Sequence, residues 1–558
     1  MRLAQAAVPS LLHPVAGATH TSGRPAPSEA DLGLAPIIHA LDYDGRHGRF
    51  VAGVLAELCD DPAVIGYRQD LLDDLLRLPS LVASIAGMLP QLGELANISR
   101  AGSWGEHIPL LQVATRLAEL DGYVTCVEQL WSALDAAGAD LHAAGLLNLH
   151  AFLSATRAQP DYQRLAEELP RLRAQLDQAG SVTLGINLDA QLRPESATIV
   201  SVNASRFAGK NSLLDRLFGE RAAPDAVRGI TALYKADERQ RHAPEHELFR
   251  DLDRLLERVS APVADALAGY TRVQSAGLAG LEPELAFYLG ATRLVNELRS
   301  AGLSLCRPAI APAGERVCVI NGAYSLDLAL RLRAARGTAG LAEALVPNDV
   351  AFGPDATIFI LTGPNSGGKT TYTRAVGQAQ ALFQAGLLVP GSRARISPVD
   401  GIYTHFAAAE RLDVGGGRLA EELERLARIF QQATSASLVL LNEPLASTDH
   451  GAARALSRVV LAGLQILGAR AVFVTHLHEL ADDMLAGDEP AAGVVSLVAG
   501  VAPRADNGAA PEPSYAIAPG RPQVAGYAAE LARRHGLSRA QIAATLRERG
   551  VAGQNDAG

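Results

Sequence analysis

The chain has 558 residues, of which 48% are hydrophobic and 20% charged, and its formal net charge is −10. This length predicts roughly three or four domains with large cores, and we see no uninterrupted apolar run of about 18 residues that would predict a transmembrane helix. The acidic total does not indicate nucleic-acid binding, but a local basic surface stays possible. The four cysteines lack C-x-x-C spacing, which is typical of reduced thiols in the cytoplasm.

The first half of the chain is mainly helical in pattern. Residues 1–35 mix Pro, Gly, Ser and Thr, and Pro9 and Pro14 break the apolar run, so we expect a flexible leader and no signal peptide. From residue 36 to residue 180, apolar residues recur at helical spacing. This pattern predicts an all-α region whose apolar faces pack on one another.

A short region of strand character interrupts the helices at residues 181–245. Residues 182–188 alternate apolar and polar side chains, and residues 197–203 read as a second strand after a turn. Residues 204–242 then carry eight basic against five acidic side chains. Two interpretations remain open for them: a solvated loop of mixed charge, or a surface that contacts nucleic-acid phosphates. Residues 246–305 return to helical spacing and predict two long helices.

The last region, residues 306–558, alternates strand and helix patterns. Short apolar runs at residues 356–361, 438–441 and 471–475 predict buried strands, and helical patterns separate them. The alternation predicts a mostly parallel sheet covered on both faces. We interpret residues 487–513 as a poorly ordered excursion with some strand character near residues 494–501. Residues 523–550 predict two short helices, which form either a packed cap or a dimer contact.

A glycine-rich loop carries the strongest chemical signal. Residues 363–370 read Gly-Pro-Asn-Ser-Gly-Gly-Lys-Thr and fit the phosphate-binding pattern, between a predicted strand and a helix that stops at Gly386. Glycines let backbone amides approach phosphate oxygens closely, Lys369 reaches the β and γ phosphates, and the Thr370 hydroxyl ligates Mg²⁺. We therefore expect ATP and Mg²⁺ to bind here. The predicted binding residues are Gly363, Pro364, Asn365, Ser366, Gly367, Gly368, Lys369, Thr370 and Thr371.

Polar residues follow the next two predicted strands. Asn442 and Glu443 end the strand at residues 438–441, where an acidic pair usually holds Mg²⁺ and activates water. Asn442 offers a metal-site oxygen without charge, and Glu443 is the candidate general base. His476 follows the next strand and is the candidate that hydrogen-bonds the γ phosphate. Ser447 to Asp449 either cap a helix or lie at a subunit boundary.

Together these segments resemble the MutS family of DNA-repair ATPases. The similarity covers the phosphate loop with Thr371, the segments at residues 389–390 and 400–406, and Thr475 to Leu480. Weaker similarity appears at Tyr67 to Asp70 and around Tyr515. The resemblance is specific in the ATPase part and weaker elsewhere.

The resemblance implies a multidomain architecture. An all-α core and lever (residues 36–180 and 246–305) carries a small β-containing, clamp-like insertion (residues 181–245). An α/β ABC-like P-loop ATPase domain with C-terminal helices follows at residues 306–558. It also implies a homodimer that holds ATP between its subunits, with residues 415–418 completing the partner's site.

Several positions depart from the family pattern. Only about 35 residues precede the helical core, so we expect a short relative without the N-terminal mismatch-reading domain. Asn442 replaces the usual Asp, and the segment after Phe406 is shortened. The leading hypothesis is a DNA-binding ATPase acting on mismatched or branched duplexes. The alternative is a nucleotide-gated scaffold with little hydrolysis that acts through protein partners.

Overall fold

The computed structural model describes most of the chain and divides it into two compact units. The described residues are 7–15, 26–101, 109–177, 181–188, 194–203, 263–267, 270, 275–406, 418–485, 492–502, 512–521 and 536–549. The first unit comprises residues 1–8, 83–138 and 148–282, and the second comprises residues 9–82, 139–147 and 283–558. Residues 36–82, which were expected in the helical core, lie in the unit that holds the ATPase sheet.

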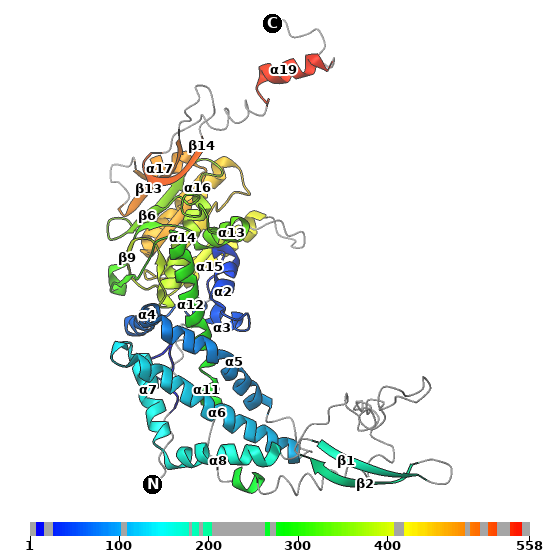
Figure 1. Ribbon diagram of the computed structural model, residues 1–558. Coiled ribbons are helices and arrows are strands. Elements are labelled where there is room, and N and C mark those ends of the chain that lie inside the picture. The colour runs from blue at the N-terminus through cyan, green and yellow to red at the C-terminus, as the bar shows by residue number, and fades with distance from the viewer. Residues whose placement is uncertain are drawn as a thin grey trace, which may run out of the picture. The chain divides into compact units, whose positions relative to one another are not determined.

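The first unit is helical with one β-hairpin, as predicted (Figure 1). Its hairpin pairs β1 (Ser181–Leu188) with β2 (Pro194–Asn203) in antiparallel register. Leucines at helical spacing on α6 and α8 form a core with Val263 and Tyr270. The predicted basic segment at residues 204–242 lies outside the described residues. The helices that contribute to this unit are α5 (Pro79–Ala101), α6 (Pro109–Ala137), α7 (Ala144–Arg157), α8 (Pro160–Asp177) and α11 (Ser275–Ala279).

Helix α5 is long and apolar enough to cross a membrane by length and composition alone, which the sequence analysis did not expect. In its most apolar window, 44% of the residues are buried within the protein. Leu81, Ile85, Leu92 and Leu95 are buried, whereas Glu94 is exposed. Burial at helical spacing is typical of a helix that packs one face on its neighbours.

The second unit is built on a six-stranded sheet with the order β10-β11-β12-β7-β13-β14. Five strands run parallel, and β14 pairs antiparallel with β13 at the edge. A four-stranded sheet, β4-β9-β5-β6, and the short pair β3-β8 complete the β-structure of the described residues. The strands are β3 (Leu305–Cys306), β4 (Ala309–Ile310), β5 (Cys318–Ala323), β6 (Asn348–Phe352), β7 (Ile358–Thr362), β8 (Val389–Pro390), β9 (Arg393–Ile396), β10 (Ile402–Phe406), β11 (Leu438–Asn442), β12 (Arg470–Val474), β13 (Val494–Ala502) and β14 (Glu512–Pro519).

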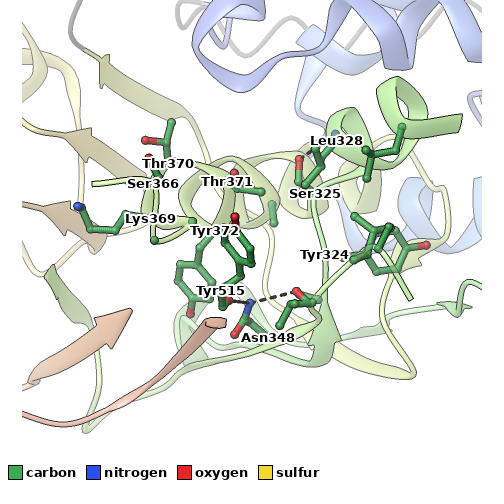
Figure 2. Close-up of a pocket in the computed structure, with 18 of the residues that line it drawn as sticks. Tyr324, Ser325, Leu328, Asn348, Ser366, Lys369, Thr370, Thr371, Tyr372 and Tyr515 are labelled. Atoms are coloured by element: carbon green, nitrogen blue, oxygen red, sulfur yellow. Dashed lines mark hydrogen bonds between the residues drawn. The ribbon is translucent and has the colours of Figure 1, made fainter. Parts of the chain in front are cut away.

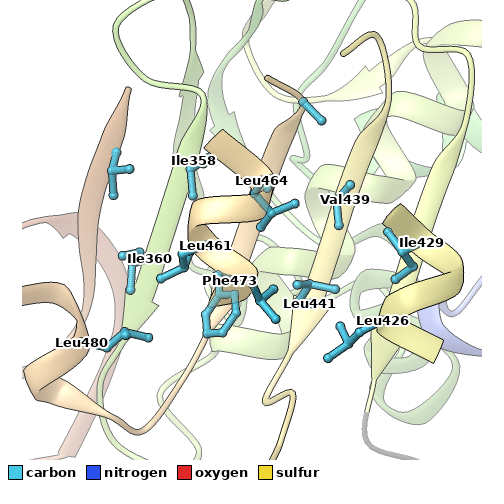
Figure 3. Packing of buried hydrophobic residues seen from close by; sticks show 14 of the residues in the cluster. Ile358, Ile360, Leu426, Ile429, Val439, Leu441, Leu461, Leu464, Phe473 and Leu480 are labelled. Carbon is cyan, nitrogen blue, oxygen red and sulfur yellow. The ribbon is translucent and has the colours of Figure 1, made fainter. Parts of the chain in front are cut away.

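Helices cover both faces of this sheet, as the strand and helix alternation predicted. One face packs on α15, α16 and α17 through an apolar cluster that includes Leu461, Phe473 and Leu441 (Figure 3). The other face packs on α14, where Gly377 allows close approach because a methyl group there would lie 2.8 Å from Leu440 Cδ1. The helices of this unit are α1 (Glu29–Leu32), α2 (Ala35–Leu41), α3 (Gly48–Glu57), α4 (Pro62–Arg77), α12 (Glu282–Ser300), α13 (Leu326–Arg336), α14 (Lys369–Gln384), α15 (Arg418–Gln432), α16 (His450–Leu467), α17 (His478–Leu485) and α19 (Arg539–Glu548).

The described parts of the expected leader pack into the second unit, so the prediction of a flexible leader is wrong for them. Leu11 and Leu12 are 0% and 3% exposed. Tyr67 donates a hydrogen bond of 2.7 Å to the Ser10 carbonyl, and Thr404 donates one of 2.6 Å to Asp31 in α1. These contacts join segments far apart in the sequence, which local composition does not reveal.

Within the expected excursion at residues 487–513, the strand character expected near residues 494–501 is confirmed, and only the expectation of poor order is wrong for its described residues. Its described part contains β13, which pairs parallel with β7. β14 then adds an edge strand that contains Pro513 and Pro519. Proline is tolerated at a sheet edge because no neighbouring strand needs its missing N–H group. Because of these prolines, the sequence pattern did not predict β14.

Candidate nucleotide site

Three parallel strands end together at the edge of the sheet that carries the phosphate loop. Asn442 pairs with Val474 across β11 and β12, and Val474 pairs with Leu361 across β12 and β7. Gly363, Glu443 and His476 each follow one of these strand ends within two residues. Parallel register therefore brings together the three motifs that the sequence analysis singled out.

The loop between β7 and α14 is wound in a conformation that suits an anion. Gly363 and Gly368 have φ angles of 128° and 89°, and Ser366 has a φ angle of 66°. Helix α14 begins at Lys369, with Gly368 as its N-cap and no side-chain hydrogen bond to the cap. The first amides of the helix thus point out of its positive end, which is a ready site for phosphate.

Lys369 is folded back over the loop. Its Nζ donates to the carbonyl oxygens of Gly363 at 2.9 Å and Pro364 at 3.0 Å. Burial lowers the pKa of Lys369, while the nearby Glu443 carboxylate opposes that effect. An ammonium group has three donors, so one donor remains for a phosphate oxygen in this arrangement.

Thr370 and Asn442 meet as the sequence analysis predicted for a metal site. The Thr370 hydroxyl donates to Asn442 Oδ1 at 3.0 Å. Adjacent ligands of an octahedral Mg²⁺, each about 2.1 Å from the ion, lie about 3 Å apart. The two oxygens therefore fit neighbouring positions around Mg²⁺. Both are neutral, so the balancing charge must come from phosphate or from a carboxylate.

Glu443 is paired with His476. Its Oε1 lies 2.6 Å from His476 Nε2, and its backbone φ of 54° is in the left-handed region. The hydrogen bond from His476 lowers the pKa of the Glu443 carboxyl, more than burial raises it. The sequence analysis expected His476 to contact phosphate. The structure pairs His476 with the candidate base, and this hydrogen bond favours the ionised carboxylate. The contact of His476 with phosphate stays a prediction.

The loop opens into a cavity of about 470 Å³. Loop residues from Asn365 to Thr371 line one part of it, together with Glu443. Figure 2 shows that Tyr324, Ser325, Leu328, Asn348 and Tyr515 form other parts of its lining. These five residues were not predicted from the sequence as part of the site. Tyr515 appeared only in a segment of family similarity.

The remaining predicted features have different outcomes. Asp449 Oδ1 accepts a hydrogen bond from the Ala452 amide at 3.0 Å, so Asp449 caps α16. This is one of the two interpretations given for residues 447–449. Residues 415–417 lie outside the described part of the chain. His478, the second histidine of its segment, has a lowered pKa because it is partly buried.

Comparisons with known proteins find two matching family models. The model of the MutS2 N-terminal domain matches residues 60–301, and the model of MutS domain V matches residues 359–497. The chain belongs to the MutS family. The domain V match contains the phosphate loop, Asn442, Glu443 and His476. Tyr324, Asn348 and Tyr515 lie outside that match, although they line the same cavity.

Several curated relatives share part of the chain. An endonuclease MutS2 of Thermomicrobium roseum is 31% identical over 236 residues, which cover 41% of this chain and 28% of the relative. A DNA mismatch repair protein MutS of Caldanaerobacter subterraneus subsp. tengcongensis is 37% identical over 139 residues, which cover 25% of this chain and 16% of the relative. A DNA mismatch repair protein MutS 2 of Halobacterium salinarum is 38% identical over 144 residues, which also cover 25% of this chain and 16% of the relative. The chain thus matches less than a third of the length of each of these relatives.

Proposed function

We propose that this MutS-family chain is an ATPase that binds DNA. ATP binding and hydrolysis in a homodimer would open and close a DNA clamp during mismatch repair or during the processing of branched or recombining DNA. The observation that carries this proposal is the meeting of the phosphate loop, the Thr370–Asn442 pair and Glu443 at one edge of the sheet. The names of the relatives support the choice of DNA as partner, and the cytoplasm is the proposed location.

Each residue of the site has a chemical role in this proposal. Lys369 and the first amides of α14 hold the phosphates and offset their charge. Thr370 and Asn442 hold Mg²⁺, which supplies charge stabilisation at the transferring phosphoryl group. Glu443, kept ionised by His476, accepts the proton of the attacking water. Residues 415–418 of a second copy complete the site.

The clamp would form from residues 181–245, with the helices around it as the lever. ATP shifts such an equilibrium only if it binds the closed state more tightly than the open state. Helix α14 offers a first step of this coupling, because it starts at the phosphate loop. Its other end contacts α4 through Arg68, whose Nη1 lies 3.4 Å from the Gln384 carbonyl oxygen.

ATP turnover with and without DNA tests this proposal. The purified chain is assayed alone, with matched duplex, with mismatched duplex and with branched DNA, at low and at moderate salt. We expect Mg²⁺-dependent turnover that DNA changes, and DNA binding that weakens as salt rises. ATP turnover that no DNA alters, together with no salt-sensitive DNA binding, would contradict it.

A nucleotide-gated scaffold with little hydrolysis is the second candidate. Asn442 favours it, because this side chain brings no charge to the metal site. Replacing Asn442 with Asp adds that charge and distinguishes the scaffold from the ATPase. A scaffold predicts negligible turnover in the natural chain and measurable turnover in Asn442→Asp. The proposed ATPase predicts measurable turnover in both, with a lower Mg²⁺ requirement in the variant.

A further inference from the structure

Asp31 lies in the short helix α1 and joins two elements of the second unit. Its side chain accepts a hydrogen bond of 2.6 Å from the Thr404 hydroxyl on β10. Its carbonyl oxygen accepts a hydrogen bond of 2.9 Å from Arg374 Nε on α14. Asp31 therefore bridges the edge strand of the six-stranded sheet and the helix that begins at the phosphate loop.

Leu32, the next residue, packs on the same helix beside the sheet. Its side chain is 0% exposed. A methyl group at Gly377 of α14 would lie 2.5 Å from Leu32 Cδ2 and 2.8 Å from Leu440 Cδ1 on β11. Gln378 Nε2 also donates to the Leu32 carbonyl oxygen at 2.7 Å. Helix α1 is therefore held on α14 by apolar and polar contacts, close to the strand that ends in Asn442.

The Asp31 bridge lies next to the proposed metal site. Arg374 follows Thr370 by about one turn of α14. Thr404 lies on β10, whose last residue pairs with Asn442 at the end of β11. The two contacts of Asp31 therefore fall on the helix that carries one predicted metal ligand and on the strand beside the other.

The two predicted metal ligands belong to different elements. Thr370, Lys369 and the first amides of the helix belong to α14, whereas Asn442 ends β11. A shift of α14 along the sheet would carry the phosphate contacts with it, but it would change the distance of 3.0 Å between Thr370 Oγ1 and Asn442 Oδ1. Because Mg²⁺ requires nearly ideal octahedral geometry, such a shift would weaken metal binding more than phosphate binding.

We propose that Asp31 is a positioning residue of the metal site, because by holding α14 to β10 it sets the distance between Thr370 and Asn442. This inference rests on the proposed binding of ATP and Mg²⁺. It gives the N-terminal segment a part in the nucleotide site, although the two matched family models begin only at residues 60 and 359.

Calorimetric binding of ATP in saturating Mg²⁺ and in EDTA separates the metal from the phosphates. Asp31→Ala removes the acceptor of the Thr404 hydroxyl and keeps the main-chain carbonyl that Arg374 contacts. We expect its ATP affinity in Mg²⁺ to fall about threefold to tenfold, as for one lost hydrogen bond, and its ATP affinity in EDTA to stay natural. Natural ATP affinity of Asp31→Ala in Mg²⁺, or equal losses in Mg²⁺ and in EDTA, would overturn the inference.

Two matched variants separate the bridge from the charge of Asp31. Asp31→Asn keeps a side-chain oxygen that can accept from Thr404, so we expect ATP affinity close to natural in both buffers. Glu29→Ala removes the same charge from an exposed position on the same helix, and it should also bind ATP as the natural chain does. A loss in either variant as large as that of Asp31→Ala would mean that the hydrogen bond to Thr404 does not position the site.

The partner side chain gives an independent test. Thr404→Val keeps the shape of the side chain and removes its hydroxyl, so we expect the same selective loss in Mg²⁺ as for Asp31→Ala. The double variant should show no further loss, because the two changes remove one shared interaction. Additive losses in the double variant would overturn the inference.

Failure of the underlying nucleotide site would look different. Lys369→Ala is expected to weaken ATP binding in both buffers, because it removes a phosphate contact. A natural chain that binds no ATP in either buffer would contradict the proposed function, and the role of Asp31 with it. A natural chain that binds ATP more tightly in Mg²⁺ than in EDTA, together with an Asp31→Ala variant that gains as much from Mg²⁺, would contradict only the role of Asp31.

Discussion

The helices on the two faces of the six-stranded sheet are held in place in different ways. The face under α15, α16 and α17 is an apolar cluster. The helix that covers the other face, α14, carries three fully buried glutamines, Gln378, Gln380 and Gln384, each 0% exposed; their hydrogen-bond partners lie outside the six-stranded sheet. Apolar packing requires only volume and shape, whereas buried amides require particular partners. The comparison shows which parts of this fold depend on distant segments of the chain.

The buried glutamines join α14 to the N-terminal segments. Gln378 Nε2 donates to the Leu32 carbonyl oxygen at 2.7 Å. Gln384 Nε2 donates to the carbonyl oxygens of Leu58 at 2.9 Å and Val399 at 2.8 Å. The helix that begins at the phosphate loop is thus hydrogen-bonded to chain segments more than 300 residues away. Movement of α14 would be passed to those segments directly.

The largest effect on stability is expected on the apolar face. Phe473 is 0% exposed and belongs to the cluster under α16. Phe473→Ala should lower the free energy of unfolding by about 3–5 kcal/mol, because it removes contacts and leaves a cavity. Urea-induced unfolding measures the loss. Ile466→Ala, at a position 88% exposed, is the control and should change stability by less than about 0.5 kcal/mol. A loss below about 1 kcal/mol for Phe473→Ala would contradict this packing.

A smaller loss is expected on the polar face. Gln384→Leu keeps the volume but leaves the Leu58 and Val399 carbonyl oxygens without their amide donor. Unpaired buried groups of this kind should lower the free energy of unfolding by about 2–3 kcal/mol. Gln431→Leu, on the exposed side of α15, provides the matched control in the same urea experiment. Equal stability of the two variants would mean that the α14 face does not depend on its hydrogen bonds.

The sequence predicted the part of this fold that local pattern determines. The phosphate-loop strand was expected at residues 356–361 and is found at Ile358–Thr362. The following helix was expected to stop at Gly386 and ends at Gln384. An apolar run, a glycine loop and a helical repeat are all local signals. The packed leader was missed because its partners, such as Glu284 for Ser10 at 2.9 Å, lie far along the chain.

The same difference between local and distant signals separates the site residues that were predicted from those that were missed. Motif spacing identified the loop, Asn442, Glu443 and His476, because each follows a strand that is apparent from its apolar run. Tyr515 and Asn348 come from β14 and β6, and only tertiary pairing brings them together. The contact between His476 and Glu443 was also missed, because a strand-end position does not specify a side-chain partner.

The smallest effect concerns the Glu443–His476 pair and its dependence on pH. The pKa of Glu443 is lowered in the folded protein, mainly by the His476 hydrogen bond, from an ordinary value of 4.5. Its stabilising contribution is therefore complete above about pH 4.5 and is lost as pH falls through the lowered value. Because the pair is partly exposed to solvent, we expect less than about 1 kcal/mol. Unfolding free energies of the natural chain and of Glu443→Gln, measured from pH 7 to pH 3, should converge at the acid end. Unfolding free energies of the two proteins that stay equally far apart down to pH 3 would contradict a lowered pKa of Glu443.

Hydrolysis by Glu443→Gln tests the central claim most directly, since this change keeps the shape of the side chain and removes only its basicity. ATP binding by calorimetry and single-turnover hydrolysis are measured on the same preparations, with Glu479→Gln as the control because Glu479 is exposed nearby and does not line the cavity. The account predicts that Glu443→Gln binds ATP with nearly natural affinity and hydrolyses it about 10²–10⁴-fold more slowly, while Glu479→Gln behaves as the natural chain does. Hydrolysis by Glu443→Gln at the natural rate would contradict it.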